Sequence, residues 1–187
     1  MNWLLAHMVD TSVSPFCSAA KLLGWDGIVI PSLDLLGARV CVVASLNVQE
    51  HEDRQEAGIG ALTDPWMLEL HEGPTAAQPA QWRKSPVHIA GIMVARQAWR
   101  GALTVASGFA AFSTRAVVLP RTQARNRRLG LEARLCGVGI VARDGQGLSL
   151  VQQPAPSPVR RTDRSMAHRL VEETVYERLQ ARLVRAG

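Results

Sequence analysis

The sequence is poor in cysteine and in long apolar runs, and each shortage excludes a class of protein. Only 3 of its 187 residues are cysteine and no CxxC pair exists, so neither a disulfide framework nor a thiolate zinc site is expected. No apolar run reaches the roughly 18 residues that span a bilayer, and residues 1–8 lack the basic start of a signal peptide. We therefore expect a cytoplasmic protein without membrane contact, whose thiols at Cys17, Cys41 and Cys136 lie reduced in the core.

Several catalytic motifs are also missing. The chain has no GxSxG elbow and no phosphate-binding loop ending in Lys-Ser or Lys-Thr, and its five histidines show no HxxxH spacing. Its two glycine pairs, at 137–139 and 145–147, are interpreted as a helix stop and a hairpin turn. Covalent hydrolases, P-loop enzymes and zinc enzymes are therefore not expected.

Lysine is nearly absent as well, yet the chain is basic. Residues 1–81 carry a net charge of −7 and residues 82–187 a net charge of +12, and only Lys21 and Lys84 are lysines. The planar guanidinium group of arginine can donate two parallel hydrogen bonds to a phosphate, which favours a nucleic-acid partner. An arginine-rich, lysine-poor composition is also typical of a GC-rich genome, and the acidic half could simply pair with the basic half.

Periodicity and turn residues predict a mixed order of strands and helices in the first half. We expect a helix that ends at Gly24 and a strand that Pro31 closes. A polar loop or frayed helix follows the second strand, then a further strand and a Pro/Ala/Gln connector. The expected ranges are helix 16–24, strands 25–30 and 40–48, polar segment 49–64, strand 66–71 and connector 73–86.

The second half is more regular. Asn126 and Gly137 bound a predicted helix, and residues 144–147 predict a hairpin turn. The expected ranges are strands 87–95, 115–120, 138–143 and 148–152, and helices 97–112, 127–136 and 163–185, the last capped by Asp163 after prolines 154, 156 and 158. This alternation predicts an α/β fold with a single mixed central sheet flanked by helices. We expect a domain over residues 1–153 with an acidic insertion at about 49–86, then a proline linker and C-terminal helix over 154–187.

Acidic residues of the segment TDPWMLELHEG are candidate metal ligands. Carboxylates on one face of a strand can hold Mg²⁺, and Glu69 would share a face with His71. An edge strand with a wet outer face is the simpler interpretation, because nothing specifies further ligands for this segment, which contains Asp64, Glu69, His71 and Glu72.

Arginines are dense between residues 115 and 143, with one acidic residue, Glu132, before Asp144. Such a cluster can dock on phosphates by releasing counterions. No aromatic residues are interleaved, so stacking on single strands is not favoured. The predicted nucleic-acid-binding residues are Arg121, Arg125, Arg127, Arg128 and Arg134.

The stretch from His88 to Gln152 resembles the PD-(D/E)xK restriction-endonuclease-like superfamily. The similarity lies in IAGIMVAR, in QAWRGALTVASGFAAFSTRAVVLP and in CGVGIVARDGQGLSLVQQP, which read as strand, helix and strand, then a Gly-Val-Gly strand. The resemblance implies a restriction-endonuclease-like fold in which Glu-x-Lys precedes the helix and an Asp lies on an earlier strand. The two carboxylates would hold Mg²⁺ and the lysine would help to activate water.

The expected catalytic positions depart from that family. Counting back from Trp99 places the acid at Met93 and the lysine at Ala95, and the earlier strand would offer only Ala44 and Leu46. We therefore expect a catalytically degenerate nuclease-like domain that binds nucleic acid or a partner protein and needs no cofactor. The alternatives are an active Mg²⁺-dependent nuclease using Asp26, Asp64 or Glu69, with Asp26 and Glu69 as metal ligands, and a non-enzymatic interaction module that forms homo-oligomers through the C-terminal helix.

Overall fold

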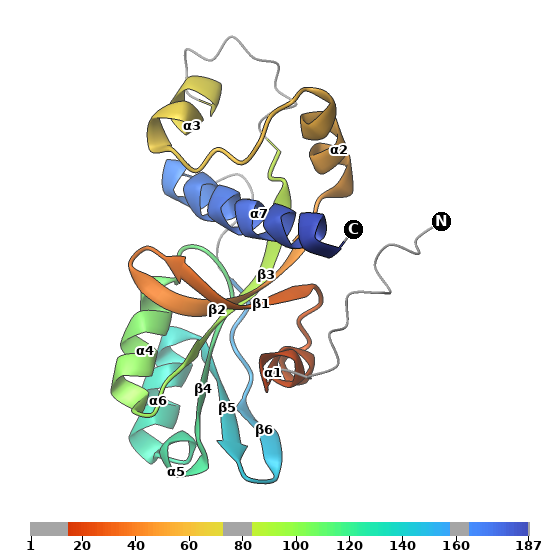
Figure 1. Cartoon of the computed structure of the whole chain (residues 1–187). Helices are drawn as coiled ribbons and strands as arrows, with labels where there is room; N and C mark the ends of the chain where they lie inside the picture. Colours follow the sequence, from red (N-terminus) through yellow and green to blue (C-terminus); the bar gives the residue numbers. More distant parts are fainter. Residues whose placement is uncertain (1–14, 73–83, 158–164, 187) are drawn as a thin grey trace.

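The computed structural model describes residues 15–72, 84–157 and 165–186, which build one mixed sheet with helices on both faces (Figure 1). The six strands lie side by side in chain order. Strands β1 to β3 are antiparallel, β3 to β5 are parallel, and β6 is antiparallel to β5. The strands are β1 (Ile28–Leu35), β2 (Ala38–Leu46), β3 (Val87–Ala95), β4 (Arg115–Pro120), β5 (Val138–Asp144) and β6 (Gly147–Gln152). The helices are α1 (Pro15–Leu23), α2 (Val48–Glu56), α3 (Pro65–Glu72), α4 (Trp99–Gly108), α5 (Arg121–Ala124), α6 (Arg127–Cys136) and α7 (Met166–Ala186). The predicted α/β class with one mixed sheet is confirmed.

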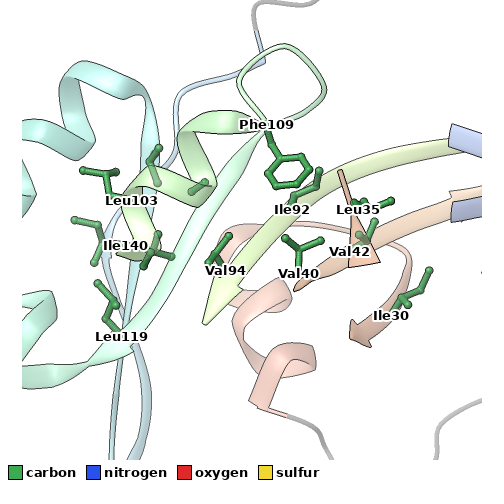
Figure 2. Close-up of a cluster of buried hydrophobic side chains, with 14 of the residues drawn as sticks. Ile30, Leu35, Val40, Val42, Ile92, Val94, Leu103, Phe109, Leu119 and Ile140 are labelled. Carbon is green, nitrogen blue, oxygen red and sulfur yellow. The ribbon is translucent and has the colours of Figure 1, made fainter. Parts of the chain in front are cut away.

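One face of the sheet carries the larger core. Helices α4 and α6 cover its parallel part, since each follows a strand and returns the chain to the next parallel one. Figure 2 shows Leu103 of α4 among Val94, Leu119 and Ile140 of the strands. Helix α7 continues the same core over β1, β2 and β3.

The opposite face packs on α1. Ala19, Ala20 and Leu23 of this helix join a second core with Cys41 and Met93, all at most 6% exposed. Cys41 is thus a core thiol, as expected, and burial raises its pKa to about 12. The expectation for Cys136 was wrong, because this residue ends α6 and its side chain is exposed.

The predicted ends of α1 and α6 are confirmed. Gly24 and Gly137 follow α1 and α6 with φ of +69° each, a left-handed conformation that favours glycine. At the start of α6 the Asn126 side chain accepts hydrogen bonds from two backbone amides, of Arg128 and Leu129. Residues 144–147 form the predicted hairpin between β5 and β6.

The first strand does not end at Pro31. It runs to Leu35, with an irregular register between Ile30 and Leu33. Because β1 is an edge strand paired only with β2, its outer side needs no backbone donor, and a proline is tolerated there. The prediction failed because it treated proline as a stop irrespective of the strand's place in the sheet.

The insertion between β2 and β3 differs from its prediction in both halves. The polar segment, for which a solvated loop or a frayed helix was expected, contains an ordered helix, α2, and the strand expected over residues 66–71 is the helix α3. Pro65 suits the first position of that helix, and the Asp64 carboxylate accepts from the backbone amides of Trp66 and Met67. Glu69 and His71 therefore do not alternate on a strand.

Buried charges hold α2 against α7. The Arg54 guanidinium donates to Glu50 at 3.0 Å and, through two nitrogens at 2.9 Å each, to both carboxylate oxygens of Glu173. Glu173 also accepts from the Leu62 backbone amide at 2.9 Å and from Arg169 at 3.3 Å. Because these side chains are buried, we call them the buried ion network: Glu50, Arg54, Arg169, Glu172 and Glu173.

Helix α7 confirms the predicted C-terminal helix. Its predicted cap at Asp163 lies outside the described residues. Its side chains Val171, Val175 and Leu179 lie in the larger core, and Arg182 donates to the Val29 carbonyl at 2.8 Å. The apolar face of α7 therefore contacts the chain's own sheet. In the part of the chain that the structure describes, no helix combines the length and apolarity needed to cross a membrane.

Candidate nucleic-acid interface

The carboxyl ends of the three parallel strands meet at one edge of the sheet. Ala95 of β3 pairs with Val118 of β4, and Pro120 of β4 pairs with Arg143 of β5, so the strands end nearly level. Whatever follows each strand is therefore placed at this edge. Helix α4 begins four residues after β3, and α5 begins directly after β4.

Arginines gather at this edge from every one of these connections. Arg96 follows β3 and Arg100 lies in the first turn of α4. Arg121 opens α5, Arg125 lies in the turn between α5 and α6, and Arg127 and Arg128 begin α6. All but the half-buried Arg143 are exposed, and we call the set the edge arginines: Arg96, Arg100, Arg121, Arg125, Arg127, Arg128 and Arg143.

The prediction named four of these seven residues. It missed Arg96 and Arg100, which lie outside the dense cluster in sequence, and it did not select Arg143. The rule that residues after successive parallel strands share one edge would have found all three. Arg134 was predicted to join the set, but it lies in the last turn of α6, about 10 Å further along the helix axis than Arg127.

Only part of the positive charge is neutralised within the protein. Arg121 pairs with Asp144 at 2.8 Å and Arg128 pairs with Glu132 at 2.7 Å. Hydrogen bonding from the Gln146 amide and the Arg121 guanidinium lowers the pKa of Asp144, so this carboxylate stays ionised at neutral pH. No carboxylate among the described residues forms an ion pair with the other five edge arginines.

The first turns of two helices add to the positive potential. Both α4 and α6 are ten residues long and begin at this edge, and a helix N-terminus carries a partial positive charge. The cap of α4 is Ala98, whose side chain cannot accept a hydrogen bond from the first-turn amides. Backbone donors therefore lie at the same edge as the arginines, an arrangement that suits phosphate oxygens.

The positions where the resemblance to restriction endonucleases places the acid and the lysine are apolar. Met93 is fully buried against α1, and its partner on β2 is the buried Cys41. Ala95 is exposed but has no functional group, and of the alternative positions Ala44 is buried and Leu46 half-buried. These residues do not fit a Mg²⁺ ion, which needs oxygen ligands.

The predicted carboxylates do not converge. Asp26 precedes Gly27, which packs on the Ala44 backbone. Ala44 pairs with Ile89, four residues or about 13 Å along β3 from Met93. Asp64 is engaged as the cap of α3, and Glu69 is exposed on that helix, at the opposite end of the molecule from α5 (Figure 1). Among the described residues, no group of three His, Cys, Asp or Glu side chains could hold a metal ion.

One cavity lies away from this edge, between the start of β3, the loop after α4 and the start of α7. Its volume is about 520 Å³. Several of its polar groups are already used inside the protein: the Asn47 amide donates to the Ser85 carbonyl, the Ser85 hydroxyl donates to the Val87 carbonyl, and His168 contacts both Ser165 and the Ala111 carbonyl. Fewer hydrogen-bonding groups are therefore free to bind a ligand in this cavity than the number of polar residues in its lining.

No family model, no curated protein and no solved structure matches this chain.

Proposed function

We propose that this chain is a catalytically degenerate nuclease-like domain that binds nucleic acid through the edge arginines without cleaving it. The observation that carries the proposal is the placement of seven arginines, from the connections after β3 and β4, from the starts of α4 and α6 and from the end of β5, on one edge of the sheet. Phosphate contacts of this kind supply most of the sequence-independent affinity for nucleic acid.

The strand–helix–strand unit of β3, α4 and β4 lies within the stretch that resembles the nuclease family, and its parallel pairing supports the proposal. In that family the acid and the lysine would lie near the end of the strand before the helix. Here Met93 and Ala95 stand there, beside Arg96 and Arg100. The edge thus retains groups that bind phosphate and lacks groups that bind a metal or activate water.

The surface favours a duplex over a single strand. Proteins that hold single strands stack bases on exposed aromatic rings. The aromatic residue nearest in sequence to the edge arginines is Trp99, which is only 8% exposed and lies 5.3 Å from the Arg100 guanidinium. Contacts to the backbone of a duplex need no such ring, so we expect binding that depends little on sequence.

The test is the salt dependence of binding to a fluorescein-labelled duplex of about 20 base pairs, measured by anisotropy. If the five edge arginines that pair with no described carboxylate each neutralise a phosphate, log K falls against log salt with a slope of about −4.5. Affinity then drops roughly 500-fold between 50 and 200 mM salt. The triple variant Arg96→Gln, Arg125→Gln, Arg127→Gln should reduce the slope by about 3.

Arg134→Gln is the matched control, because Arg134 is exposed on the same helix as Arg127 but at its other end. It should leave the slope unchanged. Binding that is insensitive to salt, or that survives in the triple variant and is lost with Arg134, would contradict the proposed interface. Cleavage of the duplex with Mg²⁺ or Mn²⁺ would contradict the degenerate site.

A further inference from the structure

Strand β6 is an edge of the sheet with unused backbone groups. It pairs on one side with β5, and among the described residues no strand lies on its other side (Figure 1). Asp144 and Gly147 pair across the hairpin turn, so in the alternating antiparallel ladder Leu148 and Leu150 direct their N–H and C=O groups away from β5. Within the described part of the chain, no backbone hydrogen bond reaches these groups. The partner that satisfies them is another extended backbone.

The other edge of the sheet, β1, is protected in ways that β6 is not. Prolines, charged side chains and irregular registers keep edge strands from pairing with other chains. Strand β1 contains Pro31 and Asp34, and its register with β2 is irregular in the middle. Strand β6 has the sequence GLSLVQ, without proline or charge, and its register with β5 is regular from Gly147 to Leu150. Of the two edges that the structure describes, only β6 is open to a further strand.

The side chains of β6 leave the core beneath α1 incomplete at this edge. Leu148 and Leu150 pack against that core and lie beside α1, but both are only half-buried. Ser149, between them, points to the opposite face of the sheet and is exposed. A second pair of apolar side chains, laid beside the two leucines on the same face, would exclude water from them.

We propose that a second copy of this chain pairs its β6 antiparallel to the first, around a two-fold axis at Ser149. In that register Leu148 of each copy lies opposite Leu150 of the other, and their outward backbone groups exchange hydrogen bonds. Directly opposite residues of antiparallel strands share a face, so the four leucines lie side by side and complete the core beneath both α1 helices. The strand is thus complementary to itself, as a two-fold interface requires, and it brings no like charges together.

The test is the mass of the full chain in light scattering at about 100 μM, a concentration at which even a modest interface is occupied. We expect the mass of two chains. Ser149→Lys places two like charges opposite each other at the axis, so it should raise the dissociation constant at least about tenfold. Ser149→Glu should do the same. An equal mixture of the two variants should restore the mass of two chains, because opposite charges then face each other.

Ser32→Lys is the matched control, because Ser32 is exposed on β1, the other edge strand, and it should leave the mass unchanged. Hydrogen exchange measures the register. The amides of Leu148 and Leu150 should exchange at least about tenfold more slowly in the parent chain than in Ser149→Lys, whereas the amide of Ala142, which pairs with position 149 inside the chain, should exchange equally in both.

Three results overturn the proposal. A parent chain with the mass of one copy leaves the edge of β6 to a strand of another protein. A dimer that persists in both Ser149 variants, or that is lost in Ser32→Lys, places the contact elsewhere on the molecule. A mixture of the two Ser149 variants that stays monomeric shows that these positions do not face each other across a two-fold axis.

Discussion

Replacing Glu173 by glutamine removes the charge on which two arginines converge. The carboxylate is 0% exposed and accepts two hydrogen bonds from Arg54, one from the Leu62 amide and one from Arg169. Glutamine has one acceptor oxygen and one donor group, so its NH₂ must face at least one of these donors. The variant therefore loses both the charge and part of the hydrogen bonding at nearly constant volume.

Removing one partner of a buried ion pair costs about 3–5 kcal/mol, because the other charge is left without compensation in a medium of low polarity. Here Glu50 remains 3.0 Å from Arg54, so we expect the lower end, about 3 kcal/mol. For a chain of 187 residues that loss lowers the melting temperature by about 6–12 °C. Urea unfolding followed by circular dichroism gives the free energy, and calorimetry gives the temperature.

Two further variants make the reasoning refutable. Glu132→Gln breaks the exposed pair with Arg128 and should cost less than about 1 kcal/mol. The triple variant Glu50→Met, Arg54→Met, Glu173→Met removes Arg54 together with both of its carboxylate partners, and Arg169 keeps its pair with Glu172. It should be more stable than Glu173→Gln alone, since none of the three groups is then left as an uncompensated buried charge. A Glu173→Gln variant within about 1 kcal/mol of the parent chain, or a triple variant less stable than Glu173→Gln, would refute the role assigned to the network.

Two more predictions follow from packing on the sheet and on α7. Burial lowers the pKa of His51, whose Nδ1 lies 2.8 Å from the Tyr176 hydroxyl. The folded state therefore binds a proton at this histidine less readily than the unfolded state does. The free energy of unfolding then decreases as the pH falls from about 6.5, the pKa of the unfolded histidine, through the lowered pKa of the folded one. The urea midpoint should therefore fall more between pH 7.5 and 5 in the parent chain than in His51→Gln, and equal falls would contradict this assignment. A Cβ on Gly91 would overlap the indole ring of Trp25, so Gly91→Ala should destabilise by about 1–3 kcal/mol, whereas Gly130→Ala on open α6 surface should stabilise by about 0.5–1 kcal/mol. Unfolding curves with the opposite order of stabilities would show that Trp25 does not pack on β3.

Local signals in the sequence predicted much of the fold. Caps such as Asn126 and glycines such as Gly137 act within a few residues, so their effect is visible in the chain itself. The insertion was harder, because the inner face of α2 is charged: Glu50 and Arg54 are buried by a partner 119 residues away from Arg54. No hydrophobic period marks such a helix. Short apolar runs like WMLEL fit either a strand or a helix, and tertiary context decides.

The candidate site was predicted in part for a related reason. The high density of arginines along the chain identified Arg121, Arg125, Arg127 and Arg128. It could not identify Arg96 and Arg100, which lie at the same edge only because β3 and β4 pair in parallel. The expectation that the catalytic positions are empty concerned side-chain identity alone, and it remains a prediction about activity.

The strands lie in the sheet in the order in which a ribosome would make them, so each can pair with its predecessor soon after it emerges. Helix α7 does not follow this order: it comes after all six strands and covers the first three, with its Glu173 on Arg54 and its Arg182 on Val29. During synthesis the apolar face of β1 to β3 therefore stays exposed until α7 is made, while the parallel half of the sheet forms. Such a chain gains its local contacts early and its longest-range contacts last, and in that interval its unfinished face is a natural target for chaperones.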